Sequence, residues 1–126
     1  MSQRTPLAKV QGLGSAKEGT QQFLQQRLTA VANLVLVCFA IWLLATLAGA
    51  DYAAVRSTLS WPPYAIALLL LVLSGVVHMR IGMQTIIEDY VHSEGRKALA
   101  LMLNSFFTVA VGLTCAYAVL KLSFGA

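Results

Sequence analysis

His78 is the residue whose type and position point most directly to chemistry. It lies within a long apolar stretch and opens the run HMRIGMQTIIEDYV, residues 78–91. An ionisable side chain inside a membrane-spanning helix is costly, so it needs a partner or a ligand. Because a neutral imidazole nitrogen is a common metal ligand, His78 is a candidate for binding a metal or a cofactor.

The residues that would share a helical face with His78 favour a flat ligand. At about 100° per residue, Gly75, Gly82, Thr85 and Asp89 all fall within about 60° of His78. The two glycines leave room for a planar group against the backbone, and haem is a planar group that carries a metal. The alternative is that His78 bonds a neighbouring helix and that the glycines are points of close helix packing.

Asp89 and Tyr90 follow near the predicted end of the same helix. Asp89 lies about 16 Å beyond His78 along the helix axis. A phenol such as Tyr90 can donate a hydrogen bond to a ligand at the membrane edge. Alternatively, Asp89 is a solvated charge and Tyr90 an interfacial anchor. Position alone leaves both interpretations open.

The composition favours a membrane protein. Of the 126 residues, 58% are hydrophobic and 11% are charged, whereas about a quarter of a soluble domain is charged. Residues 28–50, 57–79 and 98–120 contain no Asp, Glu, Lys or Arg, and each stretch exceeds the roughly 20 residues that cross a bilayer. We therefore predict an all-α fold, an integral membrane three-helix bundle with a short polar N-terminal segment.

The predicted organisation has two parts. Residues 1–26 form a polar cytoplasmic segment, and residues 27–126 form a membrane anchor domain with helices at about 28–50, 63–89 and 97–121. Residues 1–16 are expected to be a flexible tail, because they hold little apolar material. The first apolar stretch is longer than the roughly 7–15 residues of a signal-peptide core, so we expect it to span the membrane.

Lys and Arg are concentrated on one side of the predicted membrane. The N-terminal segment and the region around the second connection together carry Arg4, Lys9, Lys17, Arg27, Arg80, Arg96 and Lys97. The first connection carries only Arg56, and the C-terminal end only Lys121. Since cytoplasmic loops are enriched in these residues, the N-terminus is predicted to be cytoplasmic and the C-terminus periplasmic. This bias accounts for the net charge of +4 and gives no reason to expect nucleic acid.

Other residues that could do chemistry have simpler explanations. Cys38 and Cys115 lie within predicted spans and belong to no CxxC pair, so we expect them to act as small apolar side chains. Arg80 lies about 160° from His78 around a helix and is expected to reach the surface. His92 is expected to be solvated. Motifs for nucleotide binding, zinc hydrolysis and serine nucleophiles are absent, which argues against a soluble-type active site.

Two sequence patterns resemble those of a known family. The pattern H-x-x-I-G-M-x-x-x-x-x-D-Y-V is carried by His78, Ile81, Gly82, Met83, Asp89, Tyr90 and Val91. The pattern G-x-x-x-F-x-x-x-R-x-T-A is carried by Gly19, Phe23, Arg27, Thr29 and Ala30. Together they resemble the succinate dehydrogenase hydrophobic membrane anchor subunits, the smaller cytochrome b-type subunits of respiratory complex II. The resemblance covers residues 19–126, and the run DYVHSEG is similar to the alphaproteobacterial and mitochondrial branch.

The resemblance implies roles for individual residues. His78 matches the axial ligand of the haem b iron, with the second axial histidine supplied by a partner cytochrome subunit. Arg27 matches an arginine near the haem propionates. Tyr90 matches the tyrosine that bonds a ubiquinone carbonyl, and Asp89 matches the neighbouring acid. The chain departs from some members at Gln21, where they carry a histidine near the propionates.

The resemblance also implies a function and partners. The chain would anchor a succinate:ubiquinone oxidoreductase in the inner (cytoplasmic) membrane and serve electron transfer in the respiratory chain and the tricarboxylic acid cycle. Its partners would be a large cytochrome b-type anchor subunit, an iron–sulfur subunit and a flavoprotein subunit. The flavin and the iron–sulfur clusters would lie in those subunits, so the isolated chain is not expected to be catalytic. The alternatives are a fumarate reductase anchor and a non-redox membrane scaffold in which His78 only packs.

Overall fold

The computed structural model describes residues 6–10 and 18–125, and these residues form an all-α structure, as predicted. The helices are α1 (Pro6–Val10), α2 (Glu18–Leu47), α3 (Tyr52–Leu59), α4 (Pro62–Tyr90) and α5 (Glu94–Phe124). Helices α2, α4 and α5 are long and apolar enough to cross a membrane, which agrees with the three predicted spans. The predicted flexible tail lies outside the described residues except for α1.

Helix α2 begins earlier than hydropathy predicts. It starts at Glu18, ten residues before the expected first span at residue 28. Residues 20–27 are mostly Gln, Leu and Arg, whose unbranched side chains lose little rotamer freedom in a helix. The predicted boundary at residue 27 therefore falls inside a continuous helix, and residues 18–27 extend that helix before its apolar part.

The first connection, which was expected to be a loop, contains the short helix α3. Asp51 caps this helix, because its carboxylate oxygen Oδ1 accepts a hydrogen bond of 2.8 Å from the backbone N–H of Ala54. Pro62 then opens α4, where the missing N–H of proline costs least. The connection is thus ordered by a cap at one end and a proline at the other.

The second connection is also shorter than expected. Helix α4 ends at Tyr90 and α5 begins at Glu94, so only residues 91–93 lie between them. The third span was expected to begin at about residue 97, whereas Glu94 and Gly95 are already helical. An acidic residue in the first turn of α5 interacts favourably with the positive end of the helix dipole.

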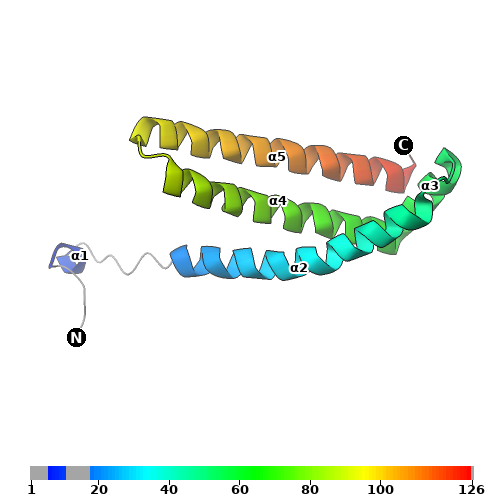
Figure 1. The fold of residues 1–126 in the computed structure, drawn as a ribbon, viewed down its shortest axis with the longest axis horizontal. Coiled ribbons are helices and arrows are strands. Elements are labelled where there is room, and N and C mark those ends of the chain that lie inside the picture. Colours follow the sequence, from blue (N-terminus) through cyan, green and yellow to red (C-terminus); the bar gives the residue numbers. More distant parts are fainter. Residues whose placement is uncertain (1–5, 11–17, 126) are drawn as a thin grey trace.

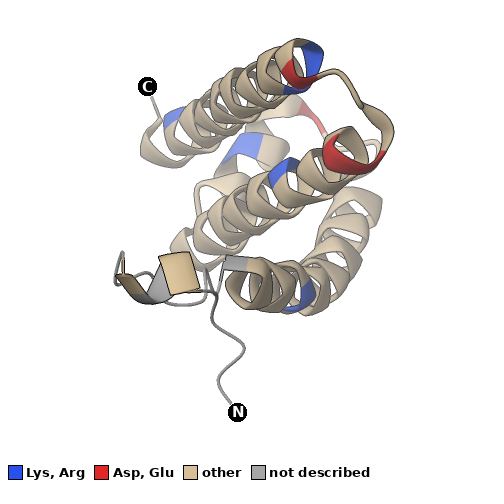
Figure 2. Ribbon diagram, turned by 90° about the vertical axis from the view of Figure 1, so that its left-hand side faces the viewer, with Lys and Arg blue, Asp and Glu red and all other residues tan. Residues whose placement is uncertain are grey.

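Helix α4 lies between α2 and α5 and packs against both, as Figures 1 and 2 show. In the part of the chain that the structure describes, the buried side chains are Leu43, Ala65, Ile81, Ile87, Asn104 and Thr108. Gly112 favours close packing of α4 and α5, since a Cβ there would lie 3.3 Å from a methyl carbon of Val76, a tight contact. Many large apolar side chains of the three spans are exposed, and these surfaces are available to lipid or to partner subunits.

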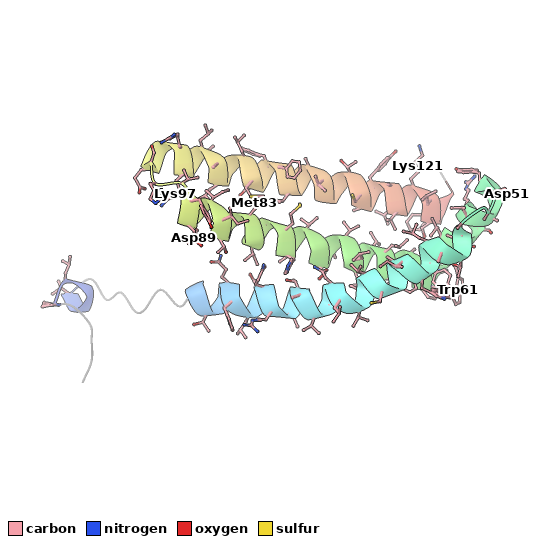
Figure 3. All side chains as sticks on the ribbon, in the orientation of Figure 1. Asp51, Trp61, Met83, Asp89, Lys97 and Lys121 are labelled. Carbon is pink, nitrogen blue, oxygen red and sulfur yellow. The ribbon has the colours of Figure 1, made fainter. Side chains whose placement is uncertain are left out.

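The two ends of the bundle carry different parts of the chain. The start of α2 and the α4–α5 connection lie at one end, and α3 and the end of α5 lie at the other (Figure 1). Figure 3 places Asp89 and Lys97 at the first end and Asp51, Trp61 and Lys121 at the second. Figure 2 shows that the charged residues lie mostly toward the helix ends. Asp89 and Tyr90 therefore sit at one boundary of the apolar bundle.

Candidate functional site

His78 lies in the middle part of α4 and faces α2. Its side chain is half-buried, 16 residues after Pro62 and therefore about 24 Å along the helix. The ring nitrogen Nδ1 lies 3.1 Å from the hydroxyl oxygen Oγ1 of Thr29, a hydrogen-bonding distance. A membrane-embedded imidazole thus has a polar partner on the neighbouring span, which lowers the cost of placing it there.

A second hydrogen bond fixes the same residue of α2. The hydroxyl of Ser74, one helical turn before His78, donates to the backbone carbonyl of Thr29 over 3.2 Å. Two α4 side chains on adjacent turns therefore contact one residue of α2. This pair of bonds sets how α2 and α4 lie against each other at the level of His78.

The other ring nitrogen of His78, Nε2, has no hydrogen-bond partner among residues 6–10 and 18–125. The same residues contain no group of three or more His, Cys, Asp and Glu side chains placed to hold a metal ion together. A single imidazole can bind a metal when a macrocycle and a second chain supply the other ligands. Within the described residues, His78 therefore offers a single nitrogen donor, and any further ligands of a bound metal would have to come from outside this set.

The predicted ligand face of α4 is only partly open within this chain. A Cβ at Gly82 would lie 3.4 Å from Nε2 of Gln26, so α2 fills the space beside that glycine, as the packing alternative expected. A Cβ at Gly75 would meet nothing within 4 Å. Thr85 bonds only the Ile81 carbonyl of its own helix. Space for a flat group beside His78 is therefore found at Gly75.

Polar groups of α2 continue on both sides of Thr29. The side-chain oxygens of Gln26 and Asn33 are buried and have no hydrogen-bond partner in the part of the chain that the structure describes. Gln26 lies three residues before Thr29 and Asn33 four residues after it, which places all three on one face of α2. The contact between α2 and α4 thus contains a row of polar side chains, although both spans are otherwise apolar.

Arg27 lies on a different side of α2 from Thr29. The two residues are two positions apart, or about 200° around the helix. The Arg27 side chain is exposed, and its guanidinium carbon lies 4.9 Å from the ring centroid of Phe23. Among the described residues of α2, Thr29 and not Arg27 has its side chain at hydrogen-bonding distance from His78. Gln21, the position that departs from the family pattern, lines a cavity with Arg80 and Gln84.

Tyr90 lies at the last position of α4 and is 77% exposed. It lines a cavity of about 340 Å³ together with His92 and Arg96, a volume within the range of about 300–1,000 Å³ that is typical of small-molecule sites. Asp89 is exposed at the same end of α4 and is not among the residues that line this cavity. Tyr90 therefore borders an open cavity beside the α4–α5 connection.

The structure adds three residues to those predicted from sequence. Thr29 belongs to a quoted pattern but was given no role, because its contact depends on the packing of α2 against α4. His92, which was expected to be solvated, is exposed but lines the Tyr90 cavity with Arg96. The sequence positions of Tyr90, His92 and Arg96 would have predicted this cavity only if the connection after Tyr90 had been known to be short.

Arg80 is exposed and takes no part in the His78–Thr29 contact, as expected. Cys38 and Cys115 are both free. Asn104 contacts a neighbouring helix, because its amide donates a 3.0 Å hydrogen bond to the Arg80 carbonyl.

Comparison with known proteins identifies relatives of the whole chain. Residues 1–112 match the family model described as "Succinate dehydrogenase/Fumarate reductase transmembrane subunit". The succinate dehydrogenase hydrophobic membrane anchor subunit of Paracoccus denitrificans is 33% identical over 122 residues, which cover 97% of this chain and 94% of the relative. The subunit of the same name from Rickettsia bellii (strain RML369-C) is 33% identical over 109 residues, covering 84% of this chain and 85% of the relative.

A third relative is more distant. The subunit of that name from Rickettsia conorii (strain ATCC VR-613 / Malish 7) is 26% identical over 113 residues, covering 86% of this chain and 87% of the relative. No solved structure matches the chain at a significant level. The family match and the relatives confirm the resemblance that the His78 and Arg27 patterns indicated. The chain belongs to the succinate dehydrogenase/fumarate reductase transmembrane subunit family.

Proposed function

We propose that this chain is the membrane anchor subunit of a succinate:ubiquinone oxidoreductase and that it contributes a haem b axial ligand and part of the ubiquinone site. Family membership supports the anchor role. The observation that carries the haem assignment is the half-buried imidazole of His78, which has one nitrogen bonded to Thr29 and the other without a partner among the described residues.

In this proposal Nε2 of His78 would bind the haem iron, and a histidine of a second cytochrome subunit would supply another ligand. Haem supplies a one-electron redox centre when it is bound. The open space at Gly75 allows the macrocycle to lie close to α4. Arg27, whose exposed guanidinium lies on a different side of α2 from Thr29, would pair with a haem propionate, since charge-assisted hydrogen bonds between opposite charges are strong.

Tyr90 and Asp89 form part of the site at which ubiquinone is reduced. Reduction to the quinol requires two electrons, which other subunits deliver, and two protons. The Tyr90 hydroxyl donates a hydrogen bond to a quinone carbonyl and stabilises the negative charge that develops on that oxygen. Asp89 is exposed beside it at the end of α4, where it can exchange protons with water.

The arrangement in the membrane follows from the charge distribution. The start of α2 and the α4–α5 connection face the cytoplasm, and α3 and the end of α5 face the periplasm, because Lys and Arg favour the cytoplasmic side. The exposed apolar surfaces of the spans contact lipid and the larger cytochrome subunit. The iron–sulfur subunit lies at the cytoplasmic end, near Tyr90, so that electrons reach the quinone over a short distance.

A fumarate reductase anchor is the second candidate, because the matching family includes both enzymes. The names of the curated relatives favour succinate oxidation. The potentials of cofactors in the other subunits set the direction of turnover. Comparing succinate oxidation with fumarate reduction in the intact complex distinguishes the two.

Deletion of this chain from its native membrane tests the anchor role. We expect succinate-dependent quinone reduction to be lost from the membrane, while succinate oxidation by an artificial acceptor moves to the soluble fraction. Re-expression of the chain should return both activities to the membrane. A membrane that keeps full succinate:quinone activity without the chain would contradict the proposed function.

A further inference from the structure

The hydroxyl of Thr29 makes two contacts that together decide which nitrogen of His78 carries the proton. Its oxygen Oγ1 lies 2.7 Å from the backbone carbonyl of Gln25, four residues earlier on α2. It also lies 3.1 Å from Nδ1 of His78. A hydroxyl has one proton to donate and two lone pairs that can accept.

The direction of both hydrogen bonds follows from the carbonyl. A carbonyl oxygen can only accept, and two oxygens 2.7 Å apart with no proton between them repel each other. The Thr29 proton is therefore committed to the carbonyl of Gln25, or in part to that of Gln26 at 3.2 Å. Toward His78 the hydroxyl can only accept, so Nδ1 must carry the hydrogen.

From this geometry we infer that Thr29 is a positioning residue that holds His78 in the Nδ1–H tautomer, with the lone pair of Nε2 directed to a metal. In a neutral imidazole only one nitrogen is protonated, so a proton on Nδ1 leaves Nε2 able to bind iron. The bond between the Ser74 hydroxyl and the Thr29 carbonyl fixes Thr29 in place. This inference rests on the proposed haem-ligand role of His78.

Two effects on a bound haem follow. Partners of a metal-bound imidazole orient the ring and raise its basicity, and their loss typically lowers metal affinity by about 10- to 100-fold. A more basic ligand favours ferric over ferrous iron. Removing the Thr29 hydroxyl should therefore weaken haem retention by about 10- to 100-fold and shift the haem midpoint potential in the positive direction.

The test compares variants of Thr29 in the purified whole complex. Thr29→Val keeps the shape of the side chain but removes the hydroxyl, and Thr29→Ser keeps the hydroxyl. We expect Thr29→Val to lose haem on dilution, to raise the midpoint potential and to alter the low-spin electron paramagnetic resonance signal, which depends on the orientation of the imidazole. Thr29→Ser should restore all three properties.

Thr46→Val is the matched control, since the Thr46 hydroxyl on the same helix bonds only the Leu43 carbonyl. It should leave all three properties unchanged. If Thr29→Val does not assemble, Thr29→Ala gives the same readouts without added apolar volume. Unchanged haem content, potential and resonance signal in the variant without the hydroxyl would overturn the inference, and so would failure of Thr29→Ser to restore them. Haem that survives unchanged in His78→Ala would instead contradict the proposed function.

Discussion

His78 and Tyr90 lie on one continuous helix, α4, twelve residues apart. The separation corresponds to about 18 Å along the axis and about 120° around it. His78 faces the Thr29 hydroxyl inside the bundle, whereas Tyr90 ends the helix beside an open cavity. A single helix thus carries the proposed haem ligand and the proposed quinone contact at separate places, and substitutions at the two should have separable effects.

Replacing Tyr90 with Phe should slow quinone reduction without loss of haem. The change keeps the ring but deletes a hydrogen bond to a carbonyl that gains charge, which costs about 1.5–3 kcal/mol, or about ten- to a hundredfold in rate. Succinate oxidation by an artificial acceptor that takes electrons before the quinone should be unchanged. The two activities can be measured on one membrane preparation.

Tyr117→Phe is the matched control, because Tyr117 is also exposed but lies on α5 outside the Tyr90 cavity. It should leave both activities at the level of the parent. If Tyr90→Phe reduces quinone as fast as the parent, Tyr90 is an interfacial anchor and the quinone site lies elsewhere.

Replacing Arg27 with Leu should weaken haem retention and shift the midpoint potential in the negative direction. Loss of a positive charge near a propionate disfavours the addition of an electron to the iron. Arg80→Leu removes a charge that the sequence assigns to the same side of the membrane, but its side chain lies apart from the His78–Thr29 contact. The haem midpoint potential of both variants can be measured by potentiometric titration. A negative shift in Arg27→Leu alone would indicate a propionate contact. If Arg27 only determines the orientation in the membrane, Arg27→Leu should have the same potential as the parent.

Replacing Gly75 with Leu should lower haem content in the complex. Within the described part of this chain a Cβ at Gly75 meets nothing within 4 Å, so the position is open to a bound group or a partner that a larger side chain would obstruct. Gly19→Leu is the control, because Gly19 is also open and lies at the start of α2. A parent-like haem content in Gly75→Leu would mean that this part of α4 faces lipid.

Replacing Asn104 with Leu should reduce the stability of the bundle modestly. The hydrogen bond from Asn104 to the Arg80 carbonyl joins α5 to α4, and such bonds in membrane proteins contribute about 0.6 kcal/mol on average and up to about 1.7 kcal/mol. We expect a small decrease in the thermal inactivation midpoint of the purified complex. Thr114→Val should leave it unchanged, since Thr114 bonds only the Ala110 carbonyl of its own helix. An equal midpoint in the two variants would argue against the interhelical bond.

Much of the fold could be predicted because hydropathy determines where a chain can cross a membrane. The three apolar stretches predicted α2, α4 and α5, and the placement of His78 and Tyr90 on one helix followed from the apolar run between them. The start of α2 was placed too late, because polar residues with high helix propensity extend a helix beyond its apolar part. Helix α3 was missed, because it depends on a local cap by Asp51.

The contacts of the site were less predictable than its residues. Which residue of α2 meets His78 depends on how two helices rotate and slide against each other, and each α2 residue is a candidate until that register is known. The Tyr90 cavity likewise depends on the short α4–α5 connection, which brings Arg96 beside Tyr90. The sequence patterns identified the ionisable residues, whereas their neighbours required the packed structure.

The central claim is that this chain supplies a haem ligand to a respiratory membrane complex, and a reduced-minus-oxidised absorption spectrum tests it most directly. The complex should be purified with the parent chain and with His78→Ala, whose three spans still insert because insertion depends on the apolar stretches. We predict a b-type haem band in the parent and its loss or clear alteration in the variant. An unchanged band and midpoint potential in His78→Ala, or a complete parent complex without haem, would contradict the claim.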